Sequence, residues 1–419
     1  MPDKADLCVF ARKLNDGNSA HTPIKPAHQA AEAYFSDEET KFTITGIGQF
    51  IGFAPLFTYM RNASTNSYAN AALIPNAHDL PTVFFSHGYA SSLGWNTVLM
   101  EHLASHGYIA YSIQHTGDAL PTVFPDHRIE QTDPELMLAV KQSSIANGIL
   151  PPSMAKSFTA ASITEQLRFH LQGAEEMFSE RQRLVVASAP VWVQDRLFVH
   201  DQLEMGRVPT DMQAIAVASN WSSTGEMGLS FGGSVSAAVC LIDRRCGAVV
   251  NIDGGDFHYK SLNADIGKPM LMLHSDINLF YQGFGIARSV SRRSLNDFAY
   301  ERYDHAGQQP DLYRLQLKGV THNGLSDFSL FLRKPLSDFL IGPSPGAEVI
   351  ALQNASILEF LDKHLKHSVN AFPEDMLAKY PELLAQYTTQ HIQRWWAELD
   401  QEEQSALKQK IELLKSKFK

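Results

Sequence analysis

The stretch EMGLSFGGSV, Glu226–Val235, places a serine between glycines with few bulky neighbours. Residues 228–232 match the pattern G-x-S-x-G, which is typical of a sharp strand-to-helix turn that presents a nucleophilic serine, here Ser230. Small residues two positions before and after the serine let the backbone reverse direction without a steric clash. A glycine-rich and serine-rich surface loop would carry the same pattern, so the surrounding sequence has to distinguish the two interpretations.

Alternating strands and helices surround this turn. TVFFS and YIAYSIQH are apolar runs typical of strands buried in a parallel sheet, and GWNTVLMEHLASHG between them has helical spacing. A strand, a helix and a strand in about 30 residues form a βαβ unit, whose right-handed crossover makes the sheet parallel. After the turn, SVSAAVCLIDRR and ASILEFLDKHLK are predicted helices, and GAVVNID, KPMLMLHSD and RLQLKGVTH are predicted strands. This order over 81–366 predicts an α/β fold with a doubly wound, mostly parallel sheet flanked by helices.

Three segments lie outside this regular pattern. We expect residues 1–80 to form an irregular segment packed on the main domain, with strands near KFTITGI and FAPLFTYM. Residues 116–220 are expected to form a cap of loops and helices, in which Ser162 and Glu165 have the spacing of a capping box. Residues 367–419 are expected to be a helical extension.

Composition excludes several classes of protein. The chain has 419 residues, 44% of them hydrophobic, and a formal net charge of −10, so it has no basic field that would attract nucleic acid. The three cysteines, Cys8, Cys240 and Cys246, lack regular spacing, which argues against a disulfide framework and a cysteine-rich zinc site. We expect Cys246 to be a buried small hydrophobe. The charged first residues lack the apolar core of a signal peptide, which favours a cytoplasmic location.

A serine nucleophile needs a base to take its proton and an acid to orient that base. Ser230 is followed by Asp253 in NIDGGD and by His322 in GVTHNGLSDF, which is the order serine, acid, histidine found in one large class of serine hydrolases. Asp276, at the end of KPMLMLHSD, is an alternative acid one strand later. We favour Asp253 and keep Asp276 as the second candidate.

Two backbone N–H groups are needed to stabilise the oxyanion of the reaction. Phe231, directly after the serine, supplies the first in our prediction, and Tyr89, in FFSHGYAS after a buried strand, supplies the second. A nearby loop carries His115, Asp118 and His127, which we expect to be hydrogen-bonded loop residues rather than pocket or metal ligands, because their spacing is not that of a compact metal site.

Four blocks of the chain resemble platelet-activating factor acetylhydrolases of the type II and plasma-like group with their bacterial relatives, within the α/β-hydrolase superfamily. They are VFFSHGYASSLGWNTVLMEHLASHGYIAYSIQH, GLSFGG, RRCGAVVNIDGG and GVTHNGLSDFSLF. The resemblance covers roughly residues 81–366 and implies the nucleophile Ser230, the acid Asp253 and the base His322. It also implies hydrolysis of a short or oxidised acyl ester, often at the sn-2 position of a phospholipid, without calcium. The chain departs from the family at Leu229, where the family usually has histidine.

The C-terminal sequence ALKQKIELLKSKFK places an apolar face between lysines. This helix could dock on an anionic lipid surface, but packing on the catalytic domain or on a second subunit is the favoured interpretation. The sequence as a whole predicts a serine-dependent carboxylic-ester hydrolase without metal or organic cofactor, whose partner is a small-molecule or lipid ester. A general carboxylesterase, lipase or polyester hydrolase is the nearest alternative, and a non-catalytic binding module with a hydrolase-like fold is an alternative of another class.

Overall fold

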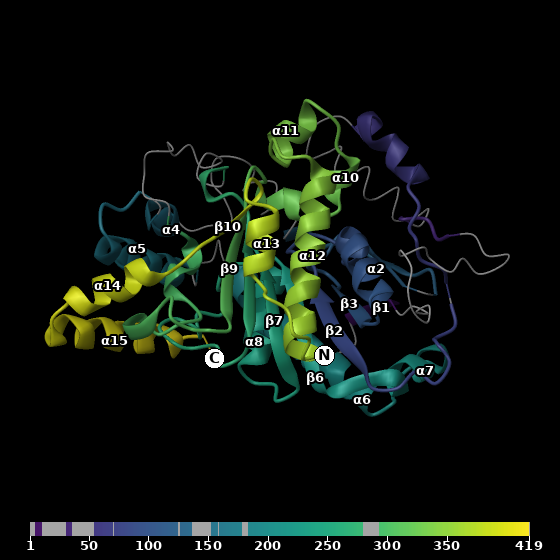
Figure 1. Cartoon of the computed structure of the whole chain (residues 1–419), viewed down its shortest axis with the longest axis horizontal. Coiled ribbons are helices and arrows are strands. Elements are labelled where there is room, and N and C mark those ends of the chain that lie inside the picture. The colour runs from purple at the N-terminus through teal and green to yellow at the C-terminus, as the bar shows by residue number, and fades with distance from the viewer. Residues whose placement is uncertain are drawn as a thin grey trace.

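A mixed sheet of eight strands forms the centre of the protein (Figure 1). The computed structural model describes residues 5–10, 31–35, 54–69, 71–124, 126–135, 152–157, 159–177, 183–279 and 293–418. The strands are β1 (Ala5–Phe10), β2 (Leu80–Ser86), β3 (Ile109–His115), β6 (Ser219–Leu229), β7 (Cys246–Ile252), β8 (Met270–His274), β9 (Leu312–Leu317) and β10 (Leu384–Gln386). Their order in the sheet is β1-β3-β2-β6-β7-β8-β9-β10. The six inner strands are parallel, and β1 and β10 pair antiparallel at the two edges. The predicted α/β class and mostly parallel sheet are therefore confirmed.

Helices cover both faces of this sheet. The helices closest to it are α2 (Thr97–Ser105), α6 (Arg183–Glu204), α8 (Phe231–Cys240) and α12 (Gly346–Leu365). α12 and α2 lie in front of the strands in Figure 1, and α8 and α6 lie behind them. The apolar sides of α2 and α12 meet buried strand residues such as Val83, Met227 and Val250. The apolar side of α8 meets Val249, and that of α6 meets Phe84. This arrangement explains the continuous apolar runs of the central strands, which are buried on both faces.

The N-terminal segment differs from its prediction. FAPLFTYM is not a strand but part of the 3-10 helix η1 (Ala54–Asn62), and KFTITGI lies outside the described residues. Phe57 and Met60 are both buried, and their spacing of three residues fits one face of a helical turn. β1, which the sequence analysis did not predict, pairs with β3, so the first residues extend the central sheet.

The region between β3 and β6 contains helices. They are α4 (Pro152–Ser157), α5 (Ile163–Glu176), α6 and α7 (Thr210–Ala218), and a small hairpin of β4 (Thr122–Val123) and β5 (Ile129–Glu130) precedes them. Ser162 caps α5 by accepting a hydrogen bond from the Glu165 amide, at 3.1 Å. The Glu165 carboxylate binds the amide of Ala161 instead of Ser162, so the reciprocal half of the predicted capping box is displaced by one residue.

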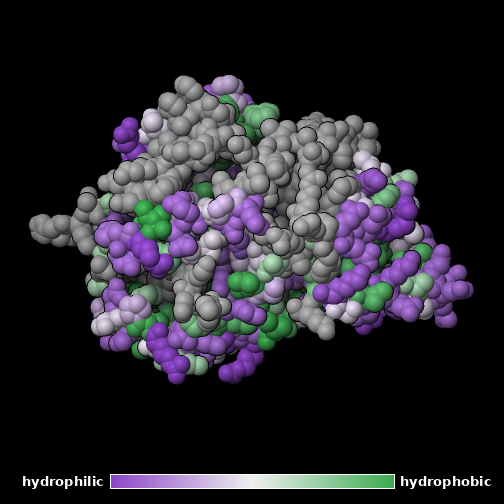
Figure 2. Space-filling view, turned by 180° about the vertical axis from the view of Figure 1, so that it is seen from behind, coloured by the Kyte–Doolittle hydropathy of each residue, from purple (hydrophilic) through white to green (hydrophobic). Residues whose placement is uncertain are grey.

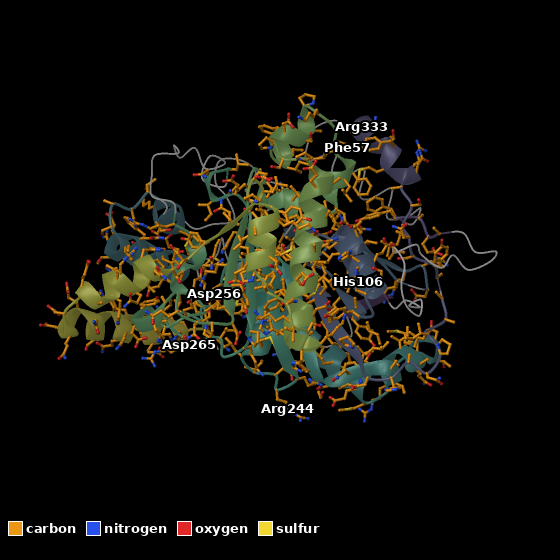
Figure 3. The ribbon with its side chains drawn as sticks, viewed as in Figure 1. Phe57, His106, Arg244, Asp256, Asp265 and Arg333 are labelled. Atoms are coloured by element: carbon orange, nitrogen blue, oxygen red, sulfur yellow. A yellow bond between two sulfur atoms is a disulfide. The ribbon has the colours of Figure 1, made fainter. Side chains whose placement is uncertain are left out.

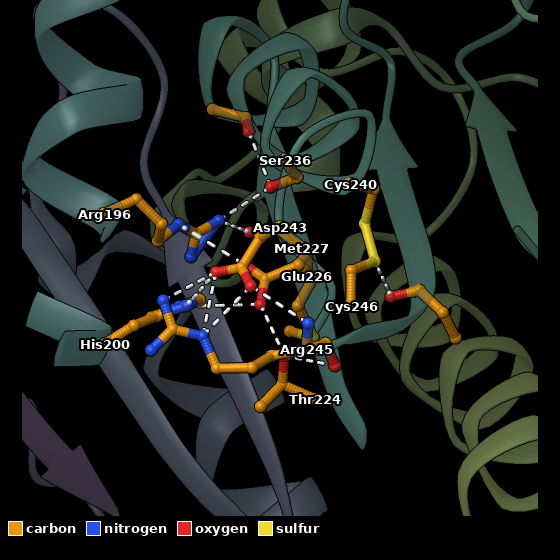
Figure 4. The surroundings of a disulfide bond; sticks show 12 residues. Arg196, His200, Thr224, Glu226, Met227, Ser236, Cys240, Asp243, Arg245 and Cys246 are labelled. Carbon is orange, nitrogen blue, oxygen red and sulfur yellow. Dashed lines mark hydrogen bonds and ion pairs between the residues drawn. A yellow bond between two sulfur atoms is a disulfide. The ribbon is translucent and has the colours of Figure 1, made fainter. Parts of the chain in front are cut away.

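The cysteine expectation needs a correction. Cys246 is buried as predicted, but it forms a disulfide with Cys240, with a Cα–Cα distance of 5.2 Å. The bond joins the end of α8 to the start of β7 across a short turn (Figure 4). The two cysteines are six positions apart in the sequence, and the return of the chain into the next strand brings them within the distance that a disulfide requires.

The C-terminal segment packs on the domain. It comprises α13 (Glu374–Lys379), β10, α14 (Gln390–Glu398) and α15 (Gln401–Lys415). Ile411, Leu414 and Phe418 are buried, and the ring of Phe418 lies 4.6 Å from that of Tyr259. The apolar face of the last helix is thus occupied by the protein itself, which agrees with the packing interpretation.

The surface formed by the described residues has mixed polarity in the view from behind. In Figure 2 hydrophobic side chains of the described residues form small patches separated by hydrophilic ones. Within the described part of the chain, none of the helices has both the length and the hydropathy that crossing a membrane would require.

Candidate active site

Five of the residues singled out from the sequence follow the carboxyl ends of parallel strands. Tyr89 follows β2, Ser230 follows β6, Asp253 follows β7, Asp276 follows β8 and His322 follows β9. Because these strands are parallel and adjacent in the order β2-β6-β7-β8-β9, the five residues come from one rim of the sheet.

Ser230 lies in a strained turn between β6 and α8. Its backbone angles are φ 56° and ψ −119°, outside the regions that a residue with a side chain readily adopts. A Cβ at Gly228 would overlap the backbone of Gly232, and a Cβ at Gly232 would overlap the carbonyl oxygen of Ser86. Only glycine therefore fits at either position. The Ser230 amide donates to the Ile252 carbonyl at 2.7 Å, which ties the turn to β7.

The loop after β2 lies directly against this turn. A Cβ built on Gly88 would be 3.4 Å from the Cβ of Ser230. The ring of Tyr89 packs on that of Phe231, with centroids 5.0 Å apart. Phe231 is the first residue of α8, and amides in the first turn of a helix have no acceptor within the helix. The two residues predicted to supply oxyanion donors thus flank Ser230.

His322 and Asp253 form a hydrogen-bonded pair. Nδ1 of His322 lies 2.7 Å from Oδ2 of Asp253, and the Ser275 amide donates to the other carboxylate oxygen at 2.9 Å. Burial raises the pKa of Asp253, but the hydrogen bond and charge of His322 outweigh this effect and the pKa lies below its ordinary value. The His322 side chain is 37% exposed and that of Asp253 is 11% exposed. The acid is therefore shielded while the imidazole faces the surface.

Asp276 has different partners. Its carboxylate accepts the amide of Gly319 at 2.8 Å and that of Asn278 at 2.9 Å. Its own amide donates to the Val320 carbonyl at 2.8 Å. Asp276 thus holds the backbone that leads to His322, whereas Asp253 binds the imidazole itself.

A buried ionic network beneath Ser230 gives Glu226 its partners (Figure 4). Glu226 is fully buried in β6 and lies 3.7 Å from Nε of Arg196 and 3.5 Å from Nε2 of His200, both on α6. The Thr224 hydroxyl donates to it at 2.8 Å. Arg196 also donates to the Met227 carbonyl at 3.0 Å. The sequence analysis did not identify these residues as a group, because nothing in the local pattern of α6 indicates a partner on β6.

The two histidines and the aspartate at and after the end of β3 do not converge. His115 is buried and bonded to Ser86 and Asp195, Asp118 accepts from the Trp192 indole at 2.8 Å, and His127 is exposed. No group of three metal-ligating side chains occurs in the described ranges. Asp256 lies between the sheet and the C-terminal helices (Figure 3), where its carboxylate accepts the amides of the turn that follows it.

Comparisons with known proteins agree with this architecture. Residues 43–149 match the family model of platelet-activating factor acetylhydrolase, isoform II. The matched range contains β2, α2 and β3. This match begins before the block of resemblance noted in the sequence and ends before the Ser230 turn. No curated protein matches the chain.

The fold is shared with a solved enzyme. A ferulic acid esterase from Streptomyces cinnamoneus has a TM-score of 0.56 and 19% sequence identity to this chain, over 87% of this chain and 86% of the esterase. At this identity the likeness concerns the fold. The comparisons thus show an α/β-hydrolase fold, and residues 43–149 are similar to platelet-activating factor acetylhydrolase, isoform II.

Proposed function

We propose that this protein hydrolyses carboxylic esters through an acyl-enzyme formed on Ser230. The Ser230 oxygen attacks the ester carbonyl while Nε2 of His322 takes the hydroxyl proton. The N–H groups of Tyr89 and Phe231 donate to the oxyanion of the tetrahedral intermediate. When this intermediate collapses, the bond to the alcohol breaks and His322 returns the proton to the alcohol oxygen.

Water then completes the reaction. His322 takes a proton from water, whose oxygen attacks the acyl carbon, and the bond to Ser230 breaks with return of that proton to the serine oxygen. Asp253 keeps the imidazole in the tautomer with its proton on Nδ1 and stabilises the imidazolium. The bond of 2.7 Å between Asp253 and Nδ1 of His322 carries this proposal, because it leaves Nε2 as the nitrogen for proton transfer.

The proposed substrate is an ester with a short acyl chain, including the sn-2 ester of a phospholipid. The match to the acetylhydrolase family model supports this class. A general carboxylesterase or polyester hydrolase remains the alternative within the same chemistry.

A second candidate substrate is an aromatic acyl ester. The rings of Tyr89, Phe231 and Phe257 form a continuous contact next to Ser230, with centroid distances of 5.0 and 5.2 Å. Tyr89 and Phe257 are only partly buried, so their rings could contact a planar acyl group. The fold it shares with a ferulic acid esterase makes methyl ferulate a suitable probe.

A substrate panel tests the proposal. The full-length protein would be assayed with p-nitrophenyl esters of increasing acyl length, a phospholipid with a short sn-2 chain, and methyl ferulate. We expect hydrolysis to be fastest for the shortest acyl chains and to disappear in Ser230→Ala. Fastest turnover of methyl ferulate would favour the aromatic candidate, and preference for long chains would favour a lipase.

Labelling with a fluorophosphonate separates an enzyme from a binding module. We expect the folded protein to be labelled at Ser230 and the Ser230→Ala variant to remain unlabelled. Ser222→Ala is the matched control, because Ser222 is an exposed serine at the start of the same strand. Absence of labelling in the folded wild-type protein would overturn the proposed catalytic role of Ser230.

A further inference from the structure

His87 is a buried histidine beside the proposed site that the reaction above does not use. It directly follows β2 and precedes Gly88 and Tyr89, whose shared peptide carries one of the two proposed oxyanion donors. On the basis of the proposed function, we infer that His87 is a positioning residue that fixes the orientation of the Gly88–Tyr89 peptide.

The hydrogen bonds of His87 determine its tautomer. The amide of His115 lies 3.1 Å from Nε2 of His87. A backbone N–H can only donate, so this nitrogen is the acceptor and carries no proton. The imidazole proton is therefore on Nδ1, which donates to the Gly88 carbonyl oxygen at 2.7 Å. His87 thus connects the end of β3 to the loop after β2 through one hydrogen bond at each ring nitrogen.

The hydrogen bonds of His87 set the direction of the Tyr89 N–H. The Gly88–Tyr89 peptide is trans, so its C=O and N–H groups point to opposite sides of one plane. The Gly88 carbonyl is held by Nδ1 of His87 and by the Ser91 amide, at 2.7 and 3.0 Å. Rotation of the peptide would break both bonds, so the Tyr89 N–H stays on the opposite side.

His115, which donates its amide to His87, is itself held rigidly. The His115 ring is hydrogen-bonded to Ser86 at 2.9 Å and to Asp195 at 2.9 Å, and it stacks on Trp192 with centroids 3.8 Å apart. Burial, together with the neighbouring His115, lowers the pKa of His87 to about 3. The imidazole therefore stays neutral in the pH range of an ester assay, as the tautomer argument requires.

Two isosteric variants separate the two bonds of His87. The amide of an asparagine can replace the Nδ1–H donor, whereas the oxygen of a glutamine can replace the Nε2 acceptor. We expect His87→Gln to lower kcat about 10-fold to 100-fold with KM within about twofold, since loss of one oxyanion donor costs 10²–10³ in rate. His87→Asn should keep kcat within about threefold of the wild type.

A comparison of oxygen and sulfur esters reports on the oxyanion site alone. A thionoester gains less from hydrogen-bond donors than the corresponding oxoester, so a displaced donor lowers the oxo-to-thiono rate ratio. We expect this ratio to fall in His87→Gln and to be retained in His87→Asn. His364→Gln, in which a half-buried imidazole on α12 is removed, should change neither kcat nor the ratio.

The outcomes are distinct. Unchanged kcat in His87→Gln, equal loss in both variants, or a fall in kcat without a change in the ratio would each overturn the inference. If the variants do not fold, the ¹⁵N shifts of His87 in the wild-type protein decide instead: protonated Nδ1 between pH 5 and 8 is expected, and protonated Nε2 contradicts it. Failure of the wild-type protein to react with esters or with a fluorophosphonate would reject the proposed function, whereas a variant result rejects only the role of His87.

Discussion

Asp253 and His322 are joined by a hydrogen bond of 2.7 Å although they follow strands β7 and β9, which are separated in the sheet by β8. Asp276, at the end of the intervening strand, binds the backbone at Gly319 and Val320. One carboxylate therefore contacts the imidazole, and the other supports the loop that carries it.

This division predicts unequal effects of two substitutions. Asp253→Asn should lower kcat by about 10⁴-fold, because the amide favours the wrong imidazole tautomer. Asp276→Asn should lower kcat by less than about tenfold, since it weakens hydrogen bonds to the loop without touching the imidazole. Steady-state kinetics on a p-nitrophenyl ester measure both. A large loss confined to Asp276→Asn would make Asp276 the acid.

Backbone strain at Ser230 should be measurable as stability. Its φ of 56° and ψ of −119° cost roughly 1–3 kcal/mol for a residue with a side chain, and glycine relieves most of that. We expect the free energy of unfolding, measured by urea denaturation, to be about 1 kcal/mol higher for Ser230→Gly than for Ser230→Ala. As a control, Ser222→Gly in the same strand should be less stable than Ser222→Ala. Equal stability of the two Ser230 variants would show that the turn is not strained.

The buried Glu226 should be costly to remove alone. Glu226→Leu leaves the guanidinium of Arg196 buried without its carboxylate partner, and we expect a loss of about 3–5 kcal/mol in the free energy of unfolding. The double variant Glu226→Leu with Arg196→Met should recover much of this loss, because both charges are then absent. Urea denaturation of the four proteins of the cycle gives the coupling energy. Additive effects of the two single changes would contradict a direct interaction.

The buried environment of Asp327 predicts that the stability of the protein depends on pH. Asp327 is buried, and Tyr34 has two acceptors, the Gly94 carbonyl and Asp327, but only one hydroxyl proton. A protonated Asp327 resolves this by donating to the Tyr34 oxygen. In agreement, burial raises the pKa of Asp327 to about 7.

The sign of this effect follows from proton binding. Between pH 4 and 7 the folded protein keeps the Asp327 proton that the unfolded chain loses, so the Asp327 contribution to stability falls as the pH rises. We expect the wild type to lose up to roughly 4 kcal/mol relative to Asp327→Asn over this range, with no further change above it. Urea denaturation of both proteins at several pH values measures the difference. A constant difference would mean that Asp327 titrates normally.

The parts of the fold that depend on local sequence could be predicted. The βαβ unit of β2, α2 and β3 has apolar runs and a helix of ordinary length, and the Ser230 turn needs glycines at fixed positions. The segment FAPLFTYM was predicted as a strand because it is apolar. It forms a 3-10 helix because Phe57 and Met60 are buried on one side against residues near Phe331. Arg333 lies beside this helix, with its guanidinium over the ring of Tyr59 (Figure 3).

Contacts between distant segments could not be predicted. The partners of Glu226, which lies on β6, are Arg196 and His200 on the helix α6. No periodicity in either segment relates these residues. The role of Asp276 could not be predicted either. The local sequence around an aspartate that follows a strand is the same whether its carboxylate binds an imidazole or a loop amide. The catalytic roles of Ser230, Asp253, His322, Tyr89 and Phe231 stay predictions, for which the kinetic experiments above are the test.

The two outer strands have a practical consequence for handling the protein. β1 comes from the start of the described chain and β10 from its last quarter. β1 covers the backbone edge of the buried strand β3, and β10 covers the last three residues of β9. Trimming either end to obtain a shorter catalytic fragment would leave unpaired N–H and C=O groups along β3 or β9. Such an exposed edge is a template for self-association, so shortened fragments are expected to precipitate rather than to simplify crystallisation.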